Sequence, residues 1–265
     1  MKAKAIFWQA LTPIHPGTGQ DSGSVIDLPV AREAATKFPI IPASSLKGVL
    51  RDGREDETSN KIFGSIEAAG ELTLTDARIL FLPVRSYAGT FALLTCPLVL
   101  QRLWRDQMAL GLGMQRELPD VGQTQAVLTS SSKIQHSNQV ILEDIDLEAQ
   151  QGLDSLAKAL SQAIFGSEEA YFIERLALVH NDVFSYFSET GMEVIARVKL
   201  KSDSKTVQDG GLWYEEAIPA EAIFSSFALS KTDDFAELNK TYIQIGGKAS
   251  VGRGLLRKLE VKANG

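Results

Sequence analysis

A short segment from Pro42 to Arg51 contains the residue types that hold phosphate groups. Ser44, which Ser45 follows, is a favourable N-cap for a helix, and the two prolines before it, Pro39 and Pro42, stop any earlier helix. Counted from Ser44, Lys47 and Arg51 recur at helical spacing, so a hydroxyl and two cations share one face of the predicted helix. The free N–H groups and the positive dipole at its start also attract phosphate. A capped surface helix with solvated bases has the same pattern, so both interpretations stay open.

A second candidate phosphate site is a glycine-rich loop between two predicted strands near the end of the sequence. Glycines let the backbone approach a ligand closely and turn N–H groups toward an anion. The loop is not a Walker A motif, because the last glycines are separated by arginine and no Lys-Ser/Thr pair follows. Such turns are often only structural, but the interleaved bases favour phosphate binding. The candidate phosphate-contacting residues are Gly246, Gly247, Lys248, Gly252 and Arg253.

Two loop residues could act in proton transfer. Asp27, between the apolar Ile26 and Leu28, could serve as a general base, orient a ribose hydroxyl or hold a metal ion. His15, at the start of a proline–glycine turn, could act in acid–base catalysis. Each also fits an ordinary structural role, Asp27 as a turn residue before Pro29 and His15 as part of its turn. The segment Leu212–Glu216 adds aromatic rings that could stack on bases or pack in the core.

Composition limits the classes of protein to which the chain can belong. With 265 residues and 44% hydrophobic content, it can form one large domain over residues 1–265. The net charge of −6 argues against a nucleic-acid binder that acts alone, although bases cluster locally. The single cysteine, Cys96, and the three scattered histidines argue against disulfides and structural zinc, so we expect a cytoplasmic protein. No apolar run approaches the roughly 18 residues of a membrane span.

The expected secondary structure mixes helices and strands without a strict alternation, which predicts an α+β fold with an antiparallel sheet. Pro and Gly breaks separate the periodic segments. A turn is expected at residues 208–211, and Asp182 is expected to cap the helix that follows it. Strands are expected at residues 2–11, 77–82, 140–147, 194–200, 212–214, 222–229, 242–245 and 255–261. Helices are expected at residues 44–51, 97–112, 153–165, 183–188 and 233–239.

The motifs, taken in order, resemble those of the RAMP proteins of CRISPR systems. They are His-x-Gly-x-Gly at 15–19, Asp-Leu-Pro at 27–29, Phe-Pro-x-Ile-Pro-x-Ser-Ser-Leu-Lys-Gly-x-Leu-Arg at 38–51, Leu-Trp-Tyr-Glu-Glu at 212–216 and the glycine-rich loop. Asp-Leu-Pro together with Leu-Trp-Tyr-Glu-Glu resembles in particular the backbone subunits of type III-B (Cmr) effector complexes. The similarity runs from Met1 to about Arg257.

This resemblance implies a modified RRM-like (ferredoxin-like) palm with insertions, including a β-hairpin thumb. It implies that copies of the chain stack in a filament along a guide RNA, with other Cmr subunits as partners. Each thumb would interrupt the duplex of guide and single-stranded target RNA, and the target would be cut beside a loop aspartate that Asp27 matches. A divalent ion, Mg²⁺ or Mn²⁺, could assist this cleavage, but the sequence does not identify its ligands.

Two other functions remain open at this stage. In one, the same basic surfaces hold guide RNA in a non-catalytic subunit and Asp27 is structural. In the other, the chain is an endoribonuclease that processes guide RNA and uses His15, a position at which related processing nucleases often carry a histidine.

Overall fold

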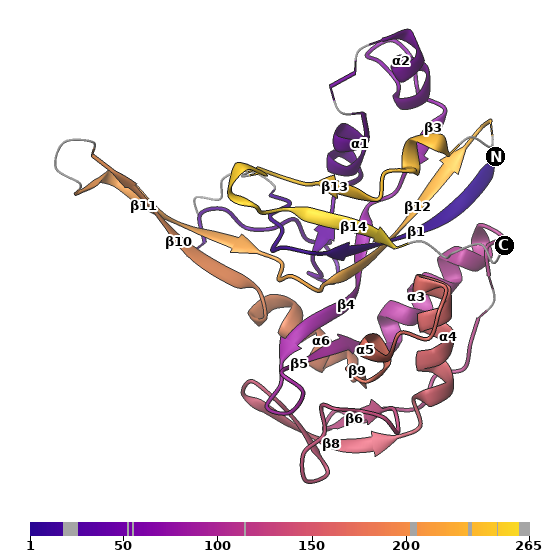
Figure 1. Cartoon of the computed structure of the whole chain (residues 1–265), viewed down its shortest axis with the longest axis vertical. Helices are drawn as coiled ribbons and strands as arrows, with labels where there is room; N and C mark the ends of the chain where they lie inside the picture. Colours follow the sequence, from indigo (N-terminus) through magenta and orange to yellow (C-terminus); the bar gives the residue numbers. More distant parts are fainter. Residues whose placement is uncertain are drawn as a thin grey trace.

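The computed structural model describes residues 1–17, 26–51, 53–54, 56–113, 115–201, 206–232, 235–247 and 249–259 (Figure 1). Its strands are β1 (Lys2–Ala10), β2 (Ile40–Ile41), β3 (Leu72–Leu74), β4 (Ala77–Arg85), β5 (Phe91–Thr95), β6 (Gln125–Leu128), β7 (Gln139–Leu142), β8 (Ile145–Gln151), β9 (Leu176–Val179), β10 (Glu193–Leu200), β11 (Val207–Ala217), β12 (Ile223–Ser230), β13 (Tyr242–Gln244) and β14 (Leu255–Leu259). Its helices are α1 (Ala43–Arg51), α2 (Glu57–Phe63), α3 (Pro97–Ala109), α4 (Asp154–Phe165), α5 (Ala170–Ile173), α6 (Asn181–Thr190) and the 3₁₀ turns η1 (Ala236–Leu238) and η2 (Ala249–Val251).

Four antiparallel strands form the platform at the centre of the large sheet, in the order β14-β1-β12-β4. Numbered along the chain among themselves, these strands lie in the order 4-1-3-2, which is the ferredoxin-like arrangement. Helix α1 connects the first two of them, whereas the helix expected between the last two is reduced to η1. The predicted α+β class with a mainly antiparallel sheet is therefore confirmed.

The central position of β1 follows from its composition. Ile6, Phe7 and Trp8 are all buried, which requires cover on both faces of the sheet. The one polar group of Trp8, its indole N–H, donates a hydrogen bond of 3.0 Å to the Ser226 hydroxyl on β12. A continuous apolar run can therefore serve as an interior strand without leaving a buried donor unsatisfied.

A large insertion between β4 and β12 extends the sheet and adds most of the helices (Figure 1). Within it, the prediction of a single strand at residues 140–147 is wrong. The chain turns at Glu143 and Asp144, so that β7 and β8 pair as an antiparallel hairpin. Glu143 adopts a φ of 45°, a left-handed conformation that closes a tight turn and that alternation of apolar and acidic residues does not reveal.

The second part of the insertion is the separate two-stranded hairpin β10-β11, which projects from the body as the predicted thumb (Figure 1). The prediction of a turn at residues 208–211 is wrong, because β11 continues through this segment. A shift in pairing register between Val198 and Leu200, with Gly210 at a φ of 69°, accommodates the glycines within the strand.

Two predicted helix starts are also corrected. Helix α1 begins at Ala43, so Ser44 lies inside the helix, and its first N–H is capped by the distant Asp76 through a bond of 2.8 Å from Ala43 N. Helix α6 begins at Asn181, with His180 rather than Asp182 at the capping position. Of the helix predicted at 233–239, residues 233–234 lie outside the described part, and the rest forms only η1. Across the described ranges, we find no helix with the length and apolar character needed to span a membrane.

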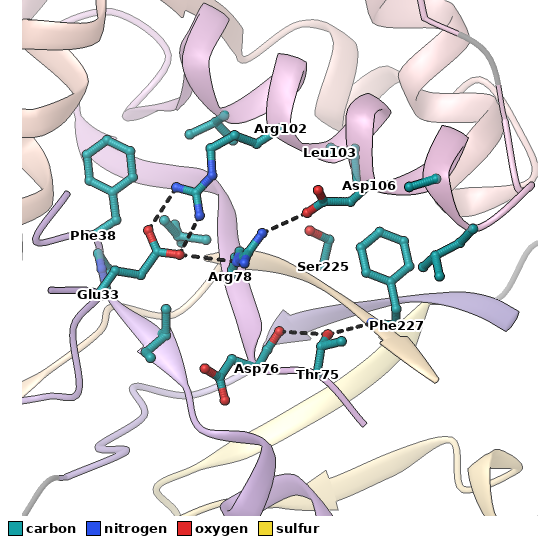
Figure 2. A pocket seen from close by; sticks show the side chains of 16 residues that line it. Glu33, Phe38, Thr75, Asp76, Arg78, Arg102, Leu103, Asp106, Ser225 and Phe227 are labelled. Carbon is teal, nitrogen blue, oxygen red and sulfur yellow. Dashed lines mark hydrogen bonds and ion pairs between the residues drawn. The ribbon is translucent and has the colours of Figure 1, made fainter. Parts of the chain in front are cut away.

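Glu33 links the loop after residue 26 to both α3 and β4 (Figure 2). Its carboxylate accepts hydrogen bonds of 2.8 and 2.5 Å from Arg102, and one oxygen lies 3.2 Å from Arg78 Nε. Burial alone would raise the pKa of Glu33, but hydrogen bonds from Arg102 and Thr36 and the charges of both arginines outweigh it. The pKa therefore lies below its ordinary value of 4.5.

This ion pair should make folding stability sensitive to acid. Because folding lowers the pKa of Glu33, its stabilising effect is complete above about pH 4.5 and is lost as the pH falls through the lower folded value. Glu33→Gln should lower the free energy of unfolding near neutral pH and make that free energy fall less steeply in acid. Urea unfolding between about pH 7 and pH 3 measures both effects. The exposed control Glu189→Gln should behave as the wild type, and an equal acid slope for Glu33→Gln would contradict the assignment.

Candidate functional site

Asp27 lies on a segment that runs beside β11 at the base of the hairpin. The N–H of Leu28 donates to Tyr214 O over 3.1 Å, and Leu28 O accepts from the N–H of Glu216 over 3.0 Å. The Asp27 side chain joins this pairing, since its Oδ2 accepts a 2.8 Å hydrogen bond from Tyr214 N. The other oxygen, Oδ1, has no hydrogen-bond partner among the described residues. One carboxylate oxygen therefore fixes the side chain, and the other is available to a ligand.

The same strand carries a carboxylate that holds the segment after Asp27. Glu216 is 4% exposed, and its Oε2 accepts a 2.9 Å hydrogen bond from Val30 N. Its Oε1 accepts a 2.5 Å charge-assisted bond from Arg32 Nη2. Arg32 Nη1 donates in turn to the carbonyl oxygens of Lys37 and Ser188, over 2.9 and 2.7 Å. These contacts hold the segment after Asp27 and helix α6 against the base of the β10-β11 hairpin.

His15 meets the same residue of β11 through the backbone. Its Nδ1 lies 2.6 Å from Glu216 O, and because a carbonyl oxygen only accepts, Nδ1 must carry the proton. In the neutral ring, Nε2 is then the acceptor and the one nitrogen open to proton exchange. A Cβ on Gly17 would stand 2.6 Å from Nε2, so glycine is needed there to leave room for the ring.

Asp27 and His15, which sequence reasoning proposed separately, both contact β11 at the base of the hairpin. The two β11 residues that they contact, Tyr214 and Glu216, are two positions apart and lie about 6.6 Å from each other along the strand. Arg32 and Glu216 were not predicted from the sequence to belong to the site. Two features of the sequence concern these residues: Arg32 follows soon after Asp-Leu-Pro, and Glu216 is the second of two glutamates after Tyr214. Neither feature indicates that the side chains of Arg32 and Glu216 meet.

The two cations of the predicted phosphate site on α1, Lys47 and Arg51, are in different situations. Lys47 has no hydrogen-bond or ion-pair partner among the described residues, and it lines a hollow of about 500 Å³ with Arg51 and the loop after Phe63. Burial and then the charge of Arg51 lower the pKa of Lys47, so a bound anion would stabilise its charged form. Ser44 is exposed and Ser45 is half-buried.

Arg51 is held by the protein itself. Its guanidinium donates to Arg54 O over 2.8 Å, to Gly64 O over 3.1 Å and to Asn60 Oδ1 over 2.5 Å. Three of its five donors are therefore used to fix α2 and the following turn against α1. Its predicted role in RNA binding stays a prediction, and Lys47 is the more available cation.

The glycine-rich loop packs against the His15 segment. Gly246 has a φ of 77°, and a Cβ there would stand 2.6 Å from His15 O, so only glycine fits. Gly247 and Gly252 face open space and could admit a phosphate backbone. Arg253 lies 3.7 Å from Glu193 at the start of β10, which joins the loop to the hairpin. Lys248 lies outside the described residues.

The aromatic segment of β11 lies partly on the surface. Tyr214 is 39% exposed and Trp213 is half-buried, so both rings are only partly available for stacking on a base. Glu215 points to the face of the hairpin opposite to Tyr214 and Glu216, where its buried carboxylate lies 3.6 Å from Arg197 Nε. The carboxylates of Glu215 and Glu216 therefore serve different contacts, and both support the hairpin base.

Known proteins share both the sequence pattern and the fold of this chain. The family model described as the RAMP superfamily matches residues 9–257. A relative from Pyrococcus furiosus, the CRISPR system Cmr endoribonuclease Cmr4, is 40% identical over all of this chain and 98% of its own length. The crystal structure of oligomeric Cmr4 from the same organism has a TM-score of 0.77 at 35% identity and covers 97% of each chain. A Type III-B Cmr-beta complex bound to cognate target RNA has a chain with a TM-score of 0.79 over 99% of this chain and 98% of that one, at 22% identity, which supports the fold alone. The chain therefore belongs to the RAMP superfamily.

Proposed function

We propose that this chain is a guide-RNA-binding backbone subunit of a type III-B CRISPR effector complex and that it cleaves guide-paired target RNA. The observation that carries the proposal is the geometry of Asp27, one oxygen of which is fixed by Tyr214 N while the other is open. The full-length similarity to a relative named as a Cmr endoribonuclease supports it. Its partners would be guide RNA, single-stranded target RNA, other Cmr subunits and further copies of itself, and it would act in the cytoplasm.

RNA supplies its own nucleophile in this reaction. The 2′-oxygen attacks the adjacent phosphorus, the bond from phosphorus to the 5′-oxygen breaks, and that oxygen takes a proton. The products are a 2′,3′-cyclic phosphate and a 5′-OH end. The protein must hold the 2′-oxygen in line with the leaving oxygen and accept its proton. Oδ1 of Asp27 would accept that proton or orient the hydroxyl.

His15 would supply the proton that the leaving 5′-oxygen takes, from Nε2 after that nitrogen has bound a proton from water. Its Nδ1–H is committed to Glu216 O, so the ring is fixed in orientation and in tautomer. Because Asp27 and His15 contact β11 two residues apart, both could approach the same phosphodiester.

A divalent ion would be held mainly by the RNA. The described residues contain no cluster of three or more His, Cys, Asp or Glu side chains that could bind a metal. If Mg²⁺ or Mn²⁺ takes part, Asp27 Oδ1 would be its protein ligand, and the carboxylate would then orient the 2′-hydroxyl rather than accept its proton. Such an ion would supply charge stabilisation at the phosphate.

Asp27→Ala should abolish target cleavage in a complex reconstituted with partner subunits and guide, and should leave guide affinity unchanged or slightly tighter. The reason is that a carboxylate near an RNA backbone is repelled by phosphate and adds nothing to binding. Single-turnover cleavage and guide titration measure the two effects separately. Cleavage at the wild-type rate would exclude Asp27 as the catalytic group.

Two other results would favour the alternative functions. Intact target after incubation of the wild-type complex with Mg²⁺ or Mn²⁺ would favour a non-catalytic subunit. Cutting of repeat RNA by the isolated chain, lost in His15→Ala, would favour guide processing.

Glu216→Gln should slow cleavage without weakening guide binding. The amide cannot hold Arg32 by charge, so the segment from Asp27 to Arg32 loses its fixed position against β11. A displacement of about 1 Å at a catalytic group can cost up to roughly a hundredfold in rate, so we expect a loss of about ten- to a hundredfold. Single-turnover rates at saturating target measure it, with Glu189→Gln as the exposed control. A wild-type rate in a correctly folded Glu216→Gln variant would show that the contact does not position Asp27.

Lys47→Ala should weaken guide binding equally for all guide sequences. Loss of one phosphate contact should reduce the salt slope of affinity by about 0.7 in log–log units for a single strand. Arg51→Ala should change the slope less and lower the melting temperature more, because its guanidinium already holds three internal acceptors. Salt titrations and thermal melts of both variants distinguish the roles, and an unchanged slope for Lys47→Ala would remove it from the phosphate site.

A further inference from the structure

A cavity of about 260 Å³ lies where the platform meets the insertion, between strands β4 and β12 and helix α3 (Figure 2). Its walls include the apolar side chains of Phe38, Ile79, Leu103 and Phe227. Sites for small molecules are typically concave and apolar with a few polar groups, and they often lie where two parts of a fold meet. The volume exceeds the roughly 150 Å³ of an apolar cavity that holds benzene, so an aromatic molecule of two fused rings fits inside.

The hydroxyl group of Ser225 is the polar group that an occupant of this cavity can bind. Ser225 lines the cavity and is 8% exposed, and its hydroxyl has no hydrogen-bond partner among the described residues. The hydroxyl of Thr75, also in the lining, already donates to one main-chain group and accepts from another. Because side chains alternate along a strand, Ser226 faces the other side of β12, where it accepts the indole N–H of Trp8. The cavity thus offers a second serine of β12 that is able to accept such an N–H.

The charged side chains on the cavity wall favour a neutral occupant that donates a hydrogen bond. Three carboxylates, from Glu33, Asp76 and Asp106, oppose the two guanidinium groups of Arg78 and Arg102, which leaves one net negative charge. This balance disfavours an anion and favours the positive end of an N–H group. Arg78 is held by Glu33 at Nε over 3.2 Å and by Asp106 at Nη1 over 2.7 Å, as Figure 2 shows. A guanidinium group fixed in this way can stack on an aromatic ring.

We propose that this cavity binds a small neutral aromatic heterocycle of about two fused rings, whose N–H donates to Ser225 Oγ. The ring packs among the apolar walls and against the guanidinium of Arg78. The lining includes neither Asp27, His15 nor Lys47, so this site is separate from the proposed RNA site. The inference therefore goes beyond the proposed function and does not depend on it.

Calorimetric titration of the full chain with indole tests the site. We expect one saturable site with a dissociation constant of about 1 mM or lower, which is reasonable for a ligand of this size. The probe 1-methylindole has the same ring without the N–H donor, and it should bind roughly tenfold more weakly. No saturation by indole up to about 10 mM, or equal affinity for the two probes, would overturn the proposal.

Ser225→Ala should weaken the binding of indole roughly tenfold and leave that of 1-methylindole unchanged, because only indole loses a hydrogen bond. Ala109→Trp, an exposed position in the lining, should weaken both probes more than tenfold by closing the mouth of the cavity. The matched control is Met108→Trp, which is exposed on α3 but outside the lining and should bind as the wild type does. An equal loss of both probes in Ser225→Ala, or wild-type affinity in Ala109→Trp, would contradict the assignment.

A tryptophan side chain of a partner protein is the other occupant that the shape admits. N-acetyltryptophanamide carries the same ring attached to two amide groups, and it should bind more weakly than indole because the cavity does not enclose those groups together with the ring. Tighter binding of this probe than of indole would assign the cavity to a partner protein and overturn the proposal. None of these titrations contains RNA, so their outcomes are independent of cleavage by Asp27.

Discussion

The buried carboxylate of Glu216 is the contact on which the geometry of the site depends. It accepts hydrogen bonds from Val30 N and Arg32 Nη2. The backbone of the same residue accepts a hydrogen bond from His15 Nδ1 at its carbonyl oxygen and donates one from its N–H to Leu28 O. A carboxylate removed from water is costly unless it is fully hydrogen-bonded, so it stabilises only the arrangement in which all partners are in place. The loop that carries Asp27 therefore has one well-defined position relative to the hairpin.

The platform and the hairpin are connected through adjacent residues of this loop. Arg32 contacts the hairpin base and α6, and the next residue, Glu33, contacts α3 and β4. The glycine-rich loop approaches from the other side, where Gly246 packs on His15 and Arg253 lies near Glu193. The segment after Asp27, which sequence alone presents as irregular, is thus held by the hairpin base and by α3 and β4, while the glycine-rich loop holds the His15 segment.

The sequence predicted well the elements whose signal is local. The apolar runs of β1 and β4 and the amphipathic faces of α1 and α4 appear where periodicity places them. It failed where residue patterns carry no signal, as at the start of α1, whose cap is the distant Asp76, and at the β7-β8 turn, which Glu143 closes at a positive φ. The candidate site followed the same rule. Asp27, His15 and Lys47 were found by residue type and motif, whereas the Arg32–Glu216 contact, 184 positions apart, requires the fold.

The chemistry of the cut ends shows whether Asp27 acts on the 2′-hydroxyl of the target RNA. A target with a single 2′-deoxynucleotide at one cleavage position should remain uncut at that position and be cut normally at the others. The fragments from the other positions should end in a 2′,3′-cyclic phosphate and begin with a 5′-OH. Cleavage at the deoxy position, or fragments with 3′-OH and 5′-phosphate ends, would mean that water is the nucleophile and would contradict the account.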